Sequence, residues 1–190
     1  MSKKYLKNLI LPIILCNFIA SSEYLEKLKV PENFEISIFA QGLDTPRQIA
    51  ETDNGYIIVG SKKGDKIFAV RDENNNGYAD SKIIVADGLQ NPTGVVVHQG
   101  DLYFSEIDKI WIIKDIDMWL DAKLSELPKK TIFMDDLPSE TWHGFKYLGF
   151  GPDGNLYIPV GVPCNICLEP QTKDNRFAAI HKFENGNLVT

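Results

Sequence analysis

His143 is the residue of this sequence whose surroundings most suggest chemistry. It lies in the stretch TWHGFKYLGFGPDGNLYIPVG (Thr141–Gly161), directly ahead of an expected strand, turn and second strand. A neutral imidazole at the mouth of a cavity can act as a general base that takes the proton of a substrate hydroxyl. The alternative is a histidine that only packs or faces solvent. That alternative is our interpretation of His98, next to a glycine turn, and of His181, in mid-strand.

A second candidate site is the loop DENNNGYAD, which could hold Ca²⁺. Its oxygen-bearing side chains stand at positions 1, 3, 5 and 9 of an EF-hand-like loop, with glycine at position 6; they are Asp72, Asn74, Asn76 and Asp80. The glutamate expected at position 12 is absent, so we expect the modest affinity that suits millimolar extracellular calcium. A plain hairpin rich in Asn and Gly, without an ion, is the equal alternative.

The cysteines suggest a disulfide. Cys164 and Cys167 form CNIC, and in an exported protein two nearby thiols are expected to oxidise to a small loop. A haem attachment would need histidine where Leu168 stands, and a zinc site would need a second pair of ligands. We therefore expect neither.

Composition limits the partners. A chain of 190 residues, 44% of them hydrophobic, can bury one sizeable core. The formal net charge is -6, and no cluster of Lys and Arg occurs beyond the first few residues. Nucleic-acid binding is therefore not expected, and a small neutral or cationic ligand fits better.

Residues 1–22 are interpreted as a signal peptide. Three lysines precede the uncharged run Asn8–Ser22, which is short for a bilayer and is interrupted by Pro12. The small residues Ala20 and Ser22 suit a cut after Ser22. We therefore expect a periplasmic or secreted protein with no stable membrane span after cleavage, the alternative being an uncleaved anchor.

Internal repeats indicate which elements position these residues. The stretch IFAQGLDTPRQIA (Ile38–Ala50) recurs as IVADGLQNPTGVV (Ile84–Val96), a shift of 46 residues, and a looser copy starts at Ile132. Short alternating runs with turn signals lie between the copies. Four short strands per unit is the pattern of propeller blades. The sequence predicts an all-β fold, a partial β-propeller over residues 31–190, with blades near 47–87, 93–136 and 143–190.

Several local features complete that expectation. Hairpin turns are expected at the Gly- and Asn-containing segments 53–55, 152–154 and 184–187, and MWLDAKLSEL (118–127) is predicted to form a short helix. Residues 35–40, EISIFA, resemble the outer-strand copies and are predicted to complete the last blade of a ring. That blade lies outside this sequence, so we expect either a truncated propeller, which we favour, or one half that pairs with another.

Repeat geometry adds two candidates beside His143. Arg47 and Thr93 occupy the same inner-strand entrance in their own repeats. Arg47 could pair with a cofactor carboxylate, or form an ordinary salt bridge at the rim. Lys146, three residues beyond His143, could face the cavity or point to solvent.

With these motifs in place, the chain resembles the pyrroloquinoline quinone (PQQ)-dependent sugar dehydrogenases of the glucose/sorbosone dehydrogenase family. The resemblance rests on TWHGFKYLGFGPDGNLYIPVGVPCNIC and GLDTPRQIA, and covers Pro31–Thr190, the N-terminal half of such a protein. It implies a six-bladed propeller in which His143 is the general base for hydride transfer from a sugar hydroxyl to PQQ, with a sugar or sugar aldehyde as substrate and a soluble electron acceptor.

The resemblance also assigns cofactor contacts. Asn165 falls where family members contact substrate or cofactor, and a bound Ca²⁺ polarises the quinone. The family's calcium ligands and basic clamp belong to later blades, which have no counterpart in this sequence. The competing interpretation is a non-enzymatic NHL-like propeller that binds carbohydrate or protein partners; a calcium-dependent lactonase is a weaker third, because its acidic ligands are not visible.

Overall fold

The computed structural model describes residues 25–166 and 173–189 and divides the chain into two units, Met1–Ile38 and Phe39–Thr190. The described part of the first unit contains turns, at Leu25–Leu28 and Pro31–Phe34. The expected signal peptide lies outside the described residues. Among the residues that are described, no helix has the length and apolar character needed to cross a bilayer.

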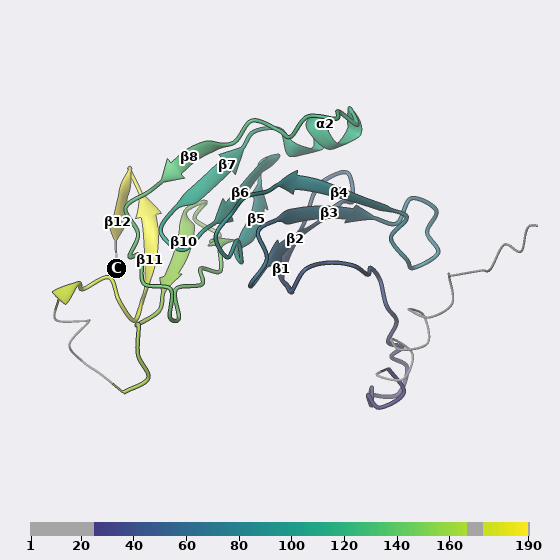
Figure 1. The fold of residues 1–190 in the computed structure, drawn as a ribbon, viewed down its shortest axis with the longest axis horizontal. Helices are drawn as coiled ribbons and strands as arrows, with labels where there is room; N and C mark the ends of the chain where they lie inside the picture. The colour runs from purple at the N-terminus through teal and green to yellow at the C-terminus, as the bar shows by residue number, and fades with distance from the viewer. Residues whose placement is uncertain (1–24, 167–172, 190) are drawn as a thin grey trace, which may run out of the picture. The chain divides into compact units, whose positions relative to one another are not determined.

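The second unit consists of three four-stranded antiparallel sheets, each made from consecutive strands (Figure 1). The first contains β1 (Pro46–Glu51), β2 (Ile57–Ser61), β3 (Ile67–Arg71) and β4 (Ser81–Ala86); the second contains β5 (Val95–His98), β6 (Asp101–Ser105), β7 (Ile110–Ile113) and β8 (Thr131–Met134); the third contains β9 (Gly149–Phe150), β10 (Leu156–Val160), β11 (Ala179–Glu184) and β12 (Asn187–Val189). These are three propeller blades, as the repeats predict, and are called blades 1, 2 and 3.

Two apolar layers hold neighbouring blades together. The layer between blades 1 and 2 includes Ile58, Val85 and Phe104, and the layer between blades 2 and 3 includes Ile110 and Ile158. Alternation of side chains along each strand sends one set to each face, so both faces of the middle blade are covered. The core therefore lies between the sheets, and the loops that enter the inner strands are left free for other roles.

The predicted hairpin turns are confirmed. Gly55 and Gly154 adopt φ values of 80° and 75°, and Asn185 and Gly186 adopt 53° and 83°. Two consecutive residues with positive φ are what a two-residue hairpin of matching twist needs. These turns connect β1 to β2, β9 to β10 and β11 to β12.

Two local predictions are corrected. The helix α2 spans Ile116–Asp121, so it begins earlier and ends sooner than the predicted 118–127. Lys123 adopts a φ of 48°, a left-handed conformation that no helix continues through. Residues 35–40 form no strand in the structure. A strand needs a neighbour to pair with, and the ends of the three described sheets are formed by other segments.

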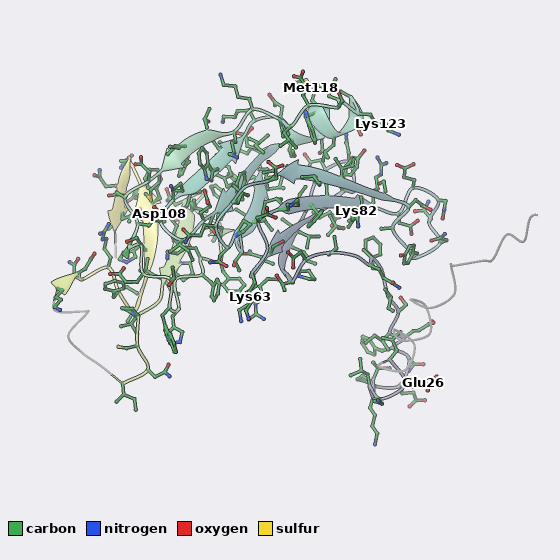
Figure 2. The ribbon with its side chains drawn as sticks, viewed as in Figure 1. Glu26, Lys63, Lys82, Asp108, Met118 and Lys123 are labelled. Carbon is green, nitrogen blue, oxygen red and sulfur yellow. The ribbon has the colours of Figure 1, made fainter. Side chains whose placement is uncertain are left out.

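The two sides of the sheets differ. Helix α2, whose Met118 is labelled in Figure 2, lies on the opposite side from Lys63, which follows β2. Asp117 of α2 accepts hydrogen bonds from Thr52 and Asn54 at the β1–β2 turn. The loop that follows β8 and residues 161–166, which follow β10, extend from the side on which Figure 2 labels Lys63 (Figures 1 and 2). We call that side the entrance face.

Candidate functional site

His143 stands on a strained turn at the entrance to blade 3. Its side chain is exposed, and its φ is 54°, a conformation that residues other than glycine seldom adopt. Gly161, directly after β10, allows the turn to approach, because an added Cβ there would collide with the carbonyl oxygen of His143. The turn is thus pressed against the end of its own blade, and the imidazole projects outward.

The imidazole is held at both nitrogens. Its Nδ1 lies 2.9 Å from the carbonyl oxygen of Val162, and its Nε2 accepts a hydrogen bond of 3.0 Å from the indole Nε1 of Trp142. A carbonyl oxygen can only accept, so Nδ1 carries the proton and Nε2 carries the lone pair. This is the tautomer in which a neutral histidine can take a proton at Nε2.

Lys146 lies inside the protein, underneath this turn. Only 1% of its surface is exposed, and its ammonium group donates a 2.6 Å hydrogen bond to the carbonyl oxygen of Gly144. Burial lowers the pKa of Lys146 to about 8, although the carboxylates of Glu140 and Asp108 act in the opposite direction. The side chain points neither to solvent nor to an open cavity, which argues against both predicted orientations.

Thr93, the residue of blade 2 that corresponds to His143, is fully buried. Its hydroxyl donates to the carbonyl oxygens of Asn91 at 3.2 Å and Ser61 at 3.4 Å. The predicted cofactor contact of Thr93 is therefore not supported by the geometry, because its hydroxyl is used to join blade 2 to blade 1.

Arg47, the corresponding residue of blade 1, is exposed on the entrance face. Its Nε donates to the hydroxyl of Tyr147 in blade 3, and its guanidinium carbon lies 5.8 Å from the centre of that ring. The ammonium group of Lys62 lies 5.3 Å from the centre of the Phe145 ring. Two cations of blade 1 thus lie against aromatic side chains of blade 3. The predicted salt bridge at the rim is replaced by these cation–aromatic contacts.

A polar cavity of about 430 Å³ opens next to the His143 turn. It is bounded by the loop before β9, by Pro163 and by the segment before β11; its lining residues are Leu137, Pro138, Ser139, Glu140, Pro163, Lys173, Asp174, Arg176 and Phe177. Arg176 binds Asp174 through Nε and Nη2, and this hydrogen bonding lowers the pKa of Asp174. The loop before β9 also carries His143, and the loop after β10, which contains Pro163, also carries Val162.

Asn165 is exposed in the loop after β10, and its predicted cofactor contact stays a prediction. Cys164 is disulfide-bonded in the structure, while Cys167, its predicted partner, lies outside the described residues. The disulfide between Cys164 and Cys167 therefore stays a prediction.

The loop Asp72–Asp80 is closed by its own backbone. The carboxylate of Asp72 accepts from the N–H groups of Asn76 and Gly77, at 3.1 and 2.7 Å, and that of Asp80 accepts from Glu73. Desolvation works to raise the pKa of Asp72, but the backbone N–H groups outweigh it and hold that pKa below its usual value. No group of three or more His, Cys, Asp or Glu side chains suited to a metal occurs in the described part of the chain. Calcium binding here stays a prediction, since two of the proposed ligands are Asn.

Sequence reasoning missed Gln48, which joins the inner strands of all three blades. Its Nε2 donates to the carbonyl oxygen of Leu148 at 2.8 Å, and its Oε1 accepts from the N–H groups of Leu148 and Val95. It also missed Asp174 and Arg176 in the cavity. A lone glutamine next to Arg47 carries no signal in one sequence, because its partners lie 47 and 100 residues away.

Comparison with known proteins identifies the family of this chain. A family model described as a domain of unknown function, DUF7133, matches residues 21–184. An uncharacterized protein of Borreliella burgdorferi is 27% identical over 160 residues, which cover 80% of this chain and 40% of that protein. The chain thus spans about two fifths of the length of this relative.

Solved structures share the fold at low identity. The holo PQQ domain of a pyranose dehydrogenase from Coprinopsis cinerea matches with a TM-score of 0.60 and 19% identity, over 75% of this chain and 34% of that one. A Trichoderma reesei carbohydrate-active enzyme of family AA12 gives 0.66 and 16%, over 80% and 39%. The PQQ-bound aldose sugar dehydrogenase of Streptomyces coelicolor gives 0.58 and 18%, over 80% and 48%. At these identities the likeness shows the propeller fold.

Proposed function

This chain belongs to the DUF7133 family, and from that premise we propose that it supplies the base-bearing blades of a PQQ-dependent sugar dehydrogenase. The observation that carries the proposal is the exposed imidazole of His143, with Nδ1–H directed to Val162 and the lone pair on Nε2. The fold neighbours include PQQ-bound sugar dehydrogenases. The chemistry is the oxidation of a sugar C–OH group to a carbonyl.

His143 moves the proton in this reaction. Nε2 takes the hydroxyl proton as the carbon–hydrogen bond gives up a hydride, and the hydrogen bond from Nδ1 to Val162 steadies the imidazolium that forms. PQQ, when bound, supplies the acceptor for that hydride. Proximity matters as much as basicity, and the strained turn holds the ring in one orientation.

The chain's residues fit PQQ along one edge. Arg47 is exposed on the entrance face, and the terminal nitrogens of its guanidinium could hold a carboxylate. Thr93 and Lys146 are buried and engaged with backbone carbonyls, so they do not serve as contacts. Asn165 remains available in the exposed loop after β10.

The test uses the whole protein produced from its gene. Reconstituted with PQQ and Ca²⁺, it should gain thermal stability and reduce an artificial dye when an aldose is added. His143→Ala should lower the rate by roughly 10²- to 10⁴-fold, the range typical for loss of a general base. His98→Gln is the matched control and should retain the rate. If PQQ neither binds nor shifts the melting temperature, the proposal fails.

The cavity favours a second function, carbohydrate binding without redox chemistry. It is polar, and it offers the carboxylates of Glu140 and Asp174 and the guanidinium of Arg176. Under this alternative, calorimetry would detect aldose binding that neither PQQ nor His143→Ala alters. Dye reduction that depends on His143 would exclude it.

Export is part of the proposal. Residues 1–22 have the pattern of a signal peptide, and Cys164 is disulfide-bonded, which fits an oxidising compartment. Mass spectrometry of the protein made in its own cells should find an N-terminus after Ser22. An intact N-terminus would overturn the predicted cleavage.

A further inference from the structure

Trp142 occupies the nitrogen of His143 that the proposed reaction needs. Its indole N–H donates to Nε2 at 3.0 Å, and the two rings meet edge to face, with centroids 5.7 Å apart and an interplanar angle of 70°. While this hydrogen bond is present, the lone pair on Nε2 is not available to another donor. An indole N–H does not give up its proton at ordinary pH, so this hydrogen bond blocks Nε2 of His143 from acting as a base.

Trp142 itself is not a core residue. Its exposed fraction is 62%, the largest among the tryptophan and tyrosine side chains described as exposed. Tryptophan is enriched at interfaces, because its amphipathic ring can pack against an apolar face and still hydrogen-bond at one edge.

The imidazole, in contrast, is fixed from two sides. Val162 accepts from Nδ1, and the close approach of Gly161 to the His143 carbonyl holds the backbone in its left-handed conformation. Of the two rings, Trp142 is the one that can leave without disturbing the turn. Its departure gives up one exposed hydrogen bond, which in proteins contributes little on balance.

We propose that Trp142 is a replaceable cap on His143: its indole covers Nε2 in the free protein, and a sugar hydroxyl takes its place while the indole packs against the apolar face of the sugar. This inference rests on the proposed function in assigning His143 as the base and a sugar as the ligand. The cap itself depends only on the geometry of the two rings. Trp142 is therefore a positioning and specificity residue.

Chemical modification tests the cap without cofactor or turnover. Diethyl pyrocarbonate acylates the free lone pair of a neutral imidazole, and peptide mass spectrometry separates His98, His143 and His181, the three histidines of the chain. Trp142→Phe keeps a ring but removes the donor, so His143 should react about fivefold faster, the factor that corresponds to a hydrogen bond of about 1 kcal/mol. His98 and His181 should be unaffected.

Trp111→Phe is the matched control. Trp111 also donates its indole N–H to a side chain, Glu106 at 2.7 Å, but lies in blade 2. Its replacement should leave the rate at His143 unchanged. If Trp142→Phe leaves that rate unchanged, or if Trp111→Phe raises it equally, the cap is refuted. Trp142→Ala provides a second variant, and circular dichroism confirms that each variant is folded.

The ligand half of the proposal has its own readout. D-glucose and D-xylose at high concentration should quench or shift the fluorescence of Trp142, identified by its loss in Trp142→Phe, and should protect His143 in the wild type from the reagent. Faster modification in Trp142→Phe together with no protection by either sugar would keep the cap and refute the sugar as its replacement. A protein that passes both arms but never reduces dye would refute the dehydrogenase proposal alone.

Discussion

The entrances of blades 2 and 3 occupy the same place in the repeat but present their side chains in opposite ways. In blade 2 the sequence Thr93-Gly94 leads into β5, and Thr93 is fully buried. In blade 3 the sequence His143-Gly144 leads toward β9, and His143 is exposed. Two residues at one repeat position thus differ in role, one joining blades and the other facing outward.

The partner glycine explains the difference. Gly60, in β2 of the preceding blade, leaves room for the carbonyl of Thr93, whereas Gly161, at the end of the same blade, leaves room for the carbonyl of His143. Ser61 donates its N–H to Pro92, so the blade 2 entrance is drawn onto blade 1. The blade 3 entrance instead turns at a positive φ, and its His143 side chain is exposed. Repeat position alone therefore does not assign function.

The largest expected effect concerns Lys146, whose counterpart in blade 2 is the apolar Val96. The pKa of Lys146 is about 8 in the fold against an ordinary 10.5, so the unfolded chain holds the proton more tightly. The buried charge therefore destabilises the fold below pH 8 by roughly 3 kcal/mol, and this cost disappears as the pH rises from about 8 to 10.5. Wild-type stability should rise over that window.

Lys146→Met removes the titration and should make blade 3 resemble blade 2. The variant should be more stable than wild type at pH 7, and the difference in unfolding free energy, measured in denaturant, should narrow between pH 8 and 10.5. Lys63→Met, at an exposed position on the same face, is the control and should show no such trend. A difference that stays constant with pH would contradict a buried ammonium group.

The next largest effect is expected from substitution of Gly60 and Gly161, which should distinguish the entrances of blades 2 and 3. Gly60→Ala and Gly161→Ala each place a Cβ against a backbone carbonyl, and overpacking of this kind costs about 1–3 kcal/mol. Both should lower the melting temperature, but only Gly161→Ala should change the modification rate of His143. Gly149→Ala is the control, since nothing lies within 4 Å of an added Cβ there. Equal effects on His143 from both variants would show that the entrances are not independent.

The serines at the ends of β2 and β6 offer a smaller contrast. Ser105 accepts from Gly94 N and donates to the carbonyl of Lys146, both at 3.0 Å, so it joins blade 2 to blade 3. Ser61 uses its hydroxyl within blade 1, toward Lys66. Ser105→Ala leaves two buried groups without a partner and should cost about 1–3 kcal/mol, more than Ser61→Ala. Thermal unfolding of both variants measures these losses of stability. A larger loss in Ser61→Ala than in Ser105→Ala would refute the role of Ser105 in joining blade 2 to blade 3.

The smallest effect concerns the connections on the outer side of each blade. Blade 1 has the Asp72–Asp80 loop where blade 2 has α2. If the loop binds Ca²⁺ at millimolar affinity, 10 mM Ca²⁺ should stabilise the protein by about 1 kcal/mol, and Asp72→Asn should remove that gain. Mg²⁺ at the same concentration is the control. A melting temperature insensitive to Ca²⁺ would refute calcium binding and favour the alternative, a hairpin that is closed by its own hydrogen bonds without an ion.

Much of the fold could be predicted from the sequence, because its signals are local. The copies of IFAQGLDTPRQIA located the blades, and segments such as 184–187 located the turns, since Gly and Asn tolerate positive φ. The limits of α2 were missed, because a single left-handed residue, Lys123, ends it. The strand predicted for residues 35–40 was wrong for a different reason: a strand depends on a neighbour to pair with.

The site was predictable in part. His143 was identified from its place ahead of an inner strand, and its exposure agrees with that choice. The roles given to Thr93 and Lys146 were not supported, because periodicity cannot tell a side chain that faces a cavity from one that is used between blades. Arg176 and Asp174 were not noticed, since they line a cavity only once the loops before β9 and β11 meet.

The sequence by itself determined the repeat, the strands and the candidate base, because each depends on residues close together in the chain. Only the tertiary structure decided which entrance residue is buried and which nitrogen of His143 carries the proton. Those outcomes depend on Gly60, Gly161 and Val162, which lie far from their partners in the sequence. Contacts of that kind exist only after the sheets have packed, since packing brings distant backbone groups within hydrogen-bonding distance.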